Sequence, residues 1–231
     1  MTMKGFTYDS KIATMCLAVA GLFIASASFV VTILPYLVFT AVVGWQSTHV
    51  SILIGVVSLV SAGPGLAALL GAGRRQMSEG GLPAHSIGRF WKDYATAWRT
   101  LIIWWVGLAV FGVALGYDLA LFGDSDVVFV AGVGVLTMGF LATVAVAGSL
   151  QSTDRGVRLV VAALAGLVRR PHIAIVWLLL TVAAGLLVAI PVVGPSLTLF
   201  IPAVWSMGIA VAPLTKMSEG RVKLAGNSIE R

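Results

Sequence analysis

The stretch SAGPGLAALLGAGRR, residues 61–75, decides the fold of this chain. It is apolar as far as Gly73 and then ends on two arginines, Arg74 and Arg75. Within it lies Gly63-Pro64-Gly65, a combination that interrupts helices and builds turns. The stretch is therefore either a loop between two membrane spans or an interruption placed inside one span, and the two interpretations give different topologies.

The composition is that of an integral membrane protein. The 231 residues are 59% hydrophobic and only 10% charged, with a mean hydropathy of +1.01, whereas soluble domains carry about 25% charged residues. The 26 glycines suit helices that pack closely in lipid. With one cysteine, Cys16, the chain cannot build a disulfide framework. We therefore expect an all-α membrane protein with one polytopic domain, residues 1–231.

Six apolar segments are long enough to cross a bilayer, which takes roughly 20 helical residues. Residues 12–73 contain no Asp, Glu, Lys or Arg, and the polar set 45–49 offers a turn within them. The first segment is too long for an upright helix, so it must tilt, kink at Pro35 or continue along the membrane surface. The expected spans are residues 12–43, 50–73, 100–121, 127–150, 173–190 and 196–214.

The distribution of basic residues sets the orientation. All 15 Lys and Arg residues lie in the N-terminal tail, in the loops 74–99 and 151–172, or in the C-terminal tail. The turns at 45–49, 117–126 and 191–195 have none. With six spans every basic segment faces one side, which the positive-inside rule makes the cytoplasm. The sequence therefore predicts six spans with both termini cytoplasmic.

This topology makes Gly63-Pro64-Gly65 an interruption inside the second span, because a loop there would add a span and place the N-terminal lysines outside. Pro64 leaves the carbonyl of Val60 without its helical partner, and the two glycines allow another backbone to approach. Either a buried kink or the wall of a cavity fits this pattern. We expect the interruption to face three positions: Ser58, Ser61 and Pro202.

Two cytoplasmic loops have the pattern of short interfacial helices. In the loop 88–100 aromatic residues share one helical face and charged residues lie away from it, and the loop 154–171 has an apolar run too short to span. The second loop is either an interfacial helix or a continuation of the fourth span. The first is either an aromatic belt with snorkelling basic groups or a surface on which a partner docks. The candidate docking residues are Arg89, Phe90, Trp91, Lys92 and Tyr94.

No pattern in the sequence points to catalysis or to a bound cofactor. The span interiors have no charged residue, all three histidines lie in turns or loops, and there is no metalloprotease, serine-hydrolase or phosphate-loop motif. We expect no catalytic residue, no metal site and no cofactor, and hence no enzyme. Three acids in one turn, which either bind a cation or form a solvated turn, are Asp118, Asp124 and Asp126.

Three stretches together resemble the YesL-like family of bacterial membrane proteins: GPGLAALLGAGRR, RFWKDYATAWRT and VRLVVAALAGLVRRPHIAIVWLLL. The resemblance covers roughly residues 25–210. It rests on eight residues: Gly63, Pro64, Ala67, Ala68, Phe90, Trp91, Arg170 and Pro171. The apolar stretch between Pro35 and Gly63 is longer than in that family, and the family's Asn-containing motif in the first helix is missing. The resemblance implies a setting with carbohydrate uptake and breakdown, and it carries over no catalytic residue.

The expected function is that of a non-enzymatic accessory component of a carbohydrate transport system in a bacterial plasma membrane. Its expected partners are the lipid bilayer and subunits of an ABC-type transporter permease, with a homo-oligomer as a further option and no nucleic acid. The alternative is a stand-alone channel or uniporter for a small neutral solute. A channel would use the interrupted span as its wall, whereas an accessory protein would bind its permease through Phe90, Trp91 and Tyr94.

Overall fold

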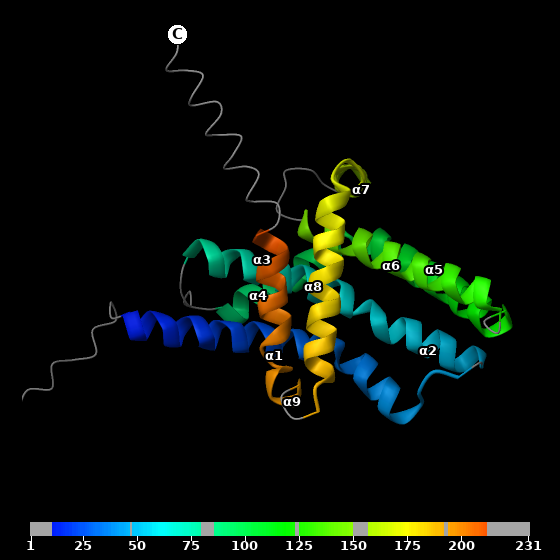
Figure 1. Ribbon diagram of the computed structural model, residues 1–231, viewed down its shortest axis with the longest axis horizontal. Coiled ribbons are helices and arrows are strands. Elements are labelled where there is room, and N and C mark those ends of the chain that lie inside the picture. The colour runs from blue at the N-terminus through cyan, green and yellow to red at the C-terminus, as the bar shows by residue number, and fades with distance from the viewer. Residues whose placement is uncertain are drawn as a thin grey trace, which may run out of the picture.

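The computed structural model describes residues 11–46, 48–79, 86–122, 125–149, 157–191 and 194–211, and within these ranges the chain is helical with short connections and no strand (Figure 1). The helices are α1 (Lys11–Val42), α2 (His49–Val60), α3 (Ala62–Glu79), α4 (Ser86–Thr100), α5 (Ile102–Phe122), α6 (Asp126–Gly148), α7 (Val157–Arg169), α8 (Pro171–Ala189), α9 (Gly194–Leu197) and the helix Ile201–Val211. The expected all-α class is confirmed.

Five segments of the described chain are long and apolar enough to cross a membrane: Met15–Val42, His49–Ser78, Ile102–Phe122, Asp126–Gly148 and Pro171–Ala189. They coincide, apart from a few residues at their ends, with the first five expected spans. The helix within the sixth, Ile201–Val211, is shorter, and residues 212–214 lie outside the described ranges. A multi-pass helical membrane protein is therefore the architecture, while the sixth span remains a prediction.

The turn between α1 and α2 is closed by its own polar groups. Gly44 has a φ of +70° and its N–H donates to the carbonyl of Phe39 over 2.9 Å, the usual left-handed end of a helix. The hydroxyl of Ser51 donates to the carbonyl of Gly44 and accepts from the N–H of Gln46. Thr48 caps α2 by accepting from the N–H of Ser51. These bonds fold α1 and α2 into an antiparallel hairpin.

The helix pair α2–α3 lies at the centre of the bundle. In the apolar stretch of this pair 56% of the residues are buried, compared with 6% in the corresponding stretches of α5 and of α8. Along α1, contacts pair Phe39 with Gly55, Thr32 with Gly65, and Ala18 with Gln76. Along α5, contacts pair Ile52 with Gly116, Val56 with Gly112, and Gly63 with Trp105. Both neighbours therefore run antiparallel to α2–α3, and small residues mark most points of close approach.

The interruption predicted from Gly63-Pro64-Gly65 lies at Ser61, the one residue between α2 and α3. Ser61 has nearly helical angles, φ −67° and ψ −23°, and the N–H of Gly65 still bonds to its carbonyl at 3.4 Å. Pro64 falls in the first turn of α3, where its missing N–H does least harm. The interruption is thus a junction inside one apolar segment, and not a loop between two.

Helix α4 packs its apolar face across α3. Phe90 is 1% exposed and lies against Ala68 and Leu69, while Ala97 is fully buried in the cluster around Leu70. The aromatic face predicted from the sequence therefore covers α3, while the place of α4 at the membrane surface stays a prediction. A strongly amphipathic helix needs an apolar surface to cover, and the small residues of α3 supply one.

Helix α7 is separate from α6 and lies against it. Leu159 and Ala163 of α7 are buried against Ala145 and Val146 of α6. Residues 150–156, between these helices, lie outside the described ranges. Of the two expectations for the second basic loop, a distinct short helix is the one that fits these contacts.

Helix α8 and the helix Ile201–Val211 lie side by side and run across the direction of α1, α2, α5 and α6 (Figure 1). The indole N–H of Trp205 donates to the hydroxyl of Thr181 at 3.0 Å, and Gly208 faces Leu180. The pair is tied to α1 by a bond from the N–H of Ala203 to the hydroxyl of Ser26 at 3.1 Å. The C-terminal part of the described chain is thereby anchored on the N-terminal helix.

We expect Gly65→Ala to destabilise the protein, since a methyl group on Gly65 would overlap the Thr32 side chain. Overpacking of this kind costs about 1–3 kcal/mol. The matched control is Gly134→Ala on α6, where a Cβ would meet no atom within 4 Å and the better helix former is neutral or stabilising. Thermal unfolding in detergent compares the two variants. Equal unfolding temperatures would show that α1 and α3 do not meet at Thr32.

Candidate functional site

The interruption in the central helix is the first candidate site, and its neighbours fill it. The hydroxyl of Ser61 donates to the carbonyl of Thr32 on α1 at 2.7 Å. Gly65 is buried against the Thr32 side chain, and a Cβ on Gly63 would come within 2.6 Å of the Trp105 ring. Pro64 is fully buried. The backbone at the interruption is thus enclosed by α1 and α5, as apolar surroundings require.

The hydroxyl groups around the interruption are already engaged. Ser58 donates to the carbonyl of Gly55 at 2.7 Å, and Thr32 donates to the carbonyl of Phe29 at the same distance. Such bonds back to the preceding turn are the usual way for Ser and Thr to lie in a membrane helix. Together with the bond from Ser61, they leave these hydroxyls committed to the fold rather than to a solute.

Pro202, which the sequence placed at the interruption, lies beside a different part of α1. The N–H of the next residue, Ala203, donates to Ser26, and Ser26 is six residues, roughly 9 Å, before Thr32 along the helix. The side chains packed on the glycines of the interruption are instead Thr32 and Trp105. A signal for Thr32 was present in the sequence, because a hairpin that turns near residue 46 places residue 61 opposite residue 32.

The largest hollow beside the interruption is apolar. It measures about 380 Å³ and is lined by residues of α1, α2, α3, α5 and α6, among them Gly63, Trp105 and Phe140. Its lining within the described ranges includes no charged side chain, and Thr143 in its wall donates back to the carbonyl of Gly139. A groove of this kind accepts an acyl chain or an apolar side chain, whereas a sugar needs several polar partners.

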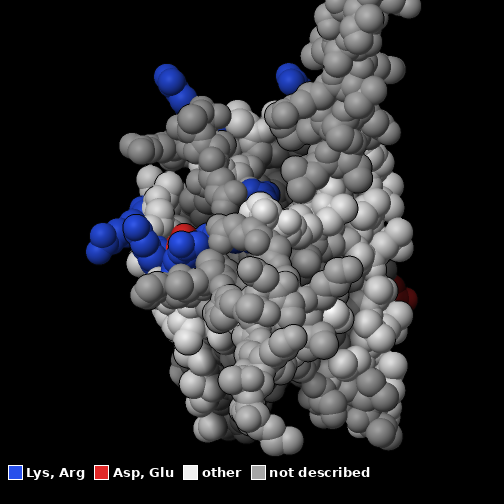
Figure 2. Space-filling view, turned by 90° about the vertical axis from the view of Figure 1, so that its left-hand side faces the viewer, with Lys and Arg blue, Asp and Glu red and all other residues white. Residues whose placement is uncertain are grey.

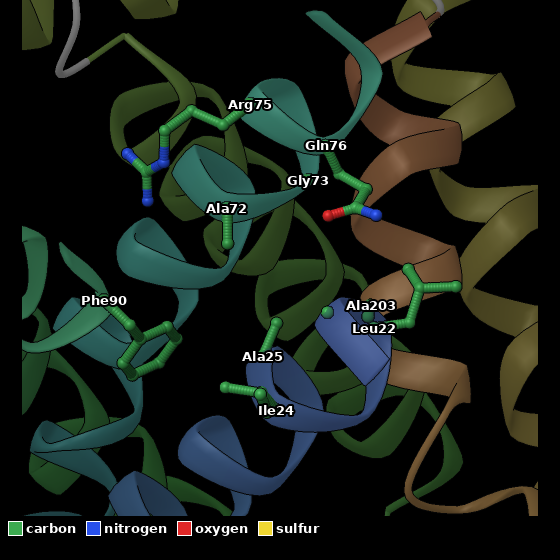
Figure 3. Close-up of a pocket in the computed structure, with 10 residues that line it drawn as sticks. Leu22, Ile24, Ala25, Ala72, Gly73, Arg75, Gln76, Phe90 and Ala203 are labelled. Atoms are coloured by element: carbon green, nitrogen blue, oxygen red, sulfur yellow. The ribbon is translucent and has the colours of Figure 1, made fainter. Parts of the chain in front are cut away.

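A second hollow, close to Arg75 and Gln76, is small and otherwise lined by apolar residues (Figure 3). Its volume is about 30 Å³, which is room for a water molecule or two. Arg75 forms an ion pair with Asp93 of α4, and the Gln76 amide donates to the carbonyl of Ala18 at 3.2 Å. Both polar side chains join helices together here. The geometry is that of a structural contact and not of a substrate site.

The candidate docking residues separate into a buried and an exposed set. Phe90 is a core residue and stacks edge-on against Trp91, with ring centres 5.7 Å apart. Tyr94 is partly buried, and this burial raises the pKa of its phenol, so the hydroxyl stays protonated. Arg89, Lys92 and Trp91, the last 38% exposed, are at the surface. Only these three are positioned to meet another molecule.

Two of the three acids in the acidic turn lie in the described part of the chain. Asp118 and Asp126 are exposed, and Asp124 lies outside the described residues. Nowhere in the described ranges do three His, Cys, Asp or Glu side chains gather in a metal-binding group. Nearby, the His49 ring and the Tyr117 hydroxyl lie 2.9 Å apart and join α2 to α5. A solvated turn is the interpretation that fits these exposures.

Phe90→Ala should destabilise the protein by about 3–5 kcal/mol, because it empties a fully buried site between α3 and α4. Trp91→Ala, one position along the same helix, removes a more exposed ring and should cost less than about 1 kcal/mol. Unfolding in detergent, followed by circular dichroism, measures both. If Phe90→Ala were as stable as Trp91→Ala, α4 would not be packed on α3.

Comparison of the chain with protein-family models, curated proteins and solved structures finds no match. The resemblance to the YesL-like family therefore stays an expectation drawn from the residues that carry it. The molecule's own geometry is the remaining basis for a function.

Proposed function

We propose that this chain is a non-enzymatic accessory component of a carbohydrate transport system in a bacterial plasma membrane. In this proposal it has six spans, with the N-terminus and the C-terminus in the cytoplasm. The sequence resemblance supplies the carbohydrate setting, and the geometry supplies the preference for an accessory role over a stand-alone channel.

The observation that supports an accessory role is the packing at the interruption of α2–α3. A channel would need this place to be open and lined by free polar groups. In the described structure Thr32 and Trp105 occupy it, and the hydroxyls of Ser58 and Ser61 bond to backbone carbonyls. A path for a neutral solute would require the three helices to separate.

The outer faces of α5 and α6 offer more to a partner than the interior does. Gly107 of α5 and Gly139 of α6 each line an apolar groove, of about 450 and 380 Å³, and a Cβ on either would meet no atom within 4 Å. Open glycines beside grooves let another membrane helix approach closely. The proposed occupant is a transmembrane helix of a permease subunit, and lipid fills the grooves in its absence.

The distribution of charge supports the proposed orientation. The left-hand end of the molecule in Figure 1, at which α1 begins, exposes described Lys and Arg side chains (Figure 2). The exposed acids Asp118 and Asp126 lie at the opposite end of α5 and α6 from Arg99 and Arg74. Positive charge on one side of the membrane marks the cytoplasmic side.

Single cysteines test this topology in a Cys16→Ala background. We expect Gln46→Cys, in the turn after α1, to react with a membrane-impermeant maleimide added to intact spheroplasts. Arg99→Cys, near the end of α4, should react only after the membrane is opened. Both positions are exposed, so reactivity reports the side of the membrane. The opposite pattern would contradict the orientation.

Purification of the tagged protein from native membranes tests the accessory role. A carbohydrate permease subunit, identified by its peptides, should co-purify with the wild type. Gly139→Leu fills the groove at an estimated cost of ~1–3 kcal/mol to any helix packed there, so recovery of the permease should fall about tenfold. Gly134→Leu is the matched control, because it adds the same side chain to the same helix in open space.

Two results would contradict the proposal. One is equal permease recovery with Gly139→Leu and Gly134→Leu, or no permease with the wild type. The other is sugar flux through liposomes that contain only the purified chain, which would favour the stand-alone channel.

A further inference from the structure

Arg74 has no acidic partner among the residues that the structure describes. It lies near the C-terminal end of α3 and is partly buried. Its guanidinium passes over the last residue of α6, with Nη2 3.1 Å from where a Cβ on Gly148 would lie. Arg74 makes no hydrogen bond or ion pair with any described residue. Burying a charged group without a partner is costly, so an anion bound beside the guanidinium of Arg74 would lower this cost.

The one acidic side chain that shares a hollow with Arg74 in the described structure is already engaged. Asp93 lines a small cavity with Arg74, but its carboxylate pairs with the neighbouring Arg75. The two adjacent arginines thus have different roles. Arg75 joins α3 to α4, while Arg74 is directed to the other side, toward α6 and α7.

On that side lies a cavity of about 340 Å³ at the meeting point of α3, α6, α7 and α8. Three arginines line it, Arg74, Arg169 and Arg170, and none of the lining residues that the structure describes is acidic. Arg169 and Arg170 are exposed at its rim, so they can turn inward without losing a described ion pair. Trp177 and the small residues of α6 and α7 make the rest of the wall.

We propose that this cavity binds a phosphate group. Guanidinium groups bind phosphate oxygens in pairs of parallel hydrogen bonds, and three of them around one hollow suit a tetrahedral anion with several oxygens. The partly apolar wall leaves room for the organic part of a phosphate ester. The same chemistry is offered by the headgroup of an anionic phospholipid and by free phosphate. Basic pockets between membrane helices are a known way to hold such headgroups.

This proposal does not depend on the accessory role. A phosphate bound by Arg74 on α3 and by the Arg169-Arg170 pair would connect the central helix to the junction of α7 and α8. Few other contacts link α8 to the bundle, since only 6% of the residues in the apolar stretch of α8 are buried. The ligand would therefore fix the position of α8.

The test uses the full-length protein, delipidated in a neutral maltoside detergent. Native mass spectrometry counts retained phosphatidylglycerol, with phosphatidylcholine as the lipid of neutral headgroup, and inorganic phosphate is titrated in a separate arm. We expect the wild type to retain phosphatidylglycerol over phosphatidylcholine, and Arg74→Gln to need about tenfold more of it. Arg158→Gln, an exposed arginine of α7 outside the cavity, should behave as the wild type.

The double variant Arg169→Gln/Arg170→Gln tests the same cavity without disturbing the fold, since both side chains are exposed. It too should weaken retention. If inorganic phosphate binds without lipid and this binding depends on Arg74, free phosphate is the ligand. If only phosphatidylglycerol binds with this dependence, the ligand is the phospholipid headgroup. Equal retention of phosphatidylglycerol by the wild type, Arg74→Gln and the double variant, with no dependence of phosphate binding on these arginines, would overturn the proposal.

Discussion

The structure depends on one constraint, that a backbone interrupted inside an apolar bundle must be enclosed by the helices of the bundle. The central helix changes from α2 to α3 at Ser61, and Pro64 leaves the carbonyl of Val60 without a helical donor. Ser61 donates to α1 at Thr32, and Thr32 and Trp105 pack onto the two glycines. The positions of α1 and α5 follow from this enclosure.

The same logic places polar chemistry at the ends of the helices and leaves the middle apolar. Hydroxyls in the middle bond to carbonyls, as Ser58 does, while Arg75 and Asp93 pair near the end of α3. Helix α4 follows the same arrangement. Its Phe90 packs against small residues of α3, while its Arg89 and Lys92 are exposed. This arrangement leaves large apolar side chains exposed on the outer faces of helices such as α5 and α8.

The first five of the six expected spans coincide with long apolar helices, because long runs without charge have few alternatives in lipid. The sequence also predicted that the Gly63-Pro64-Gly65 interruption lies inside a span, since charge distribution limits the number of crossings. It did not predict the partners of that interruption, because Thr32 and Trp105 come from helix register and tilt, which composition does not reveal. Phe90 was expected at a surface for a similar reason: an amphipathic face shows that something is covered, but not what covers it.

The closed junction is the central claim, and the reactivity of a cysteine one turn before it is the most direct measurement. In a Cys16→Ala background, Ser58→Cys keeps the size of a side chain that is 8% exposed. It should stay unmodified by a charged methanethiosulfonate reagent applied from either side of the membrane, while Gln46→Cys reacts from one side. Modification of Ser58→Cys at a rate comparable to Gln46→Cys would show water at the junction and contradict the account.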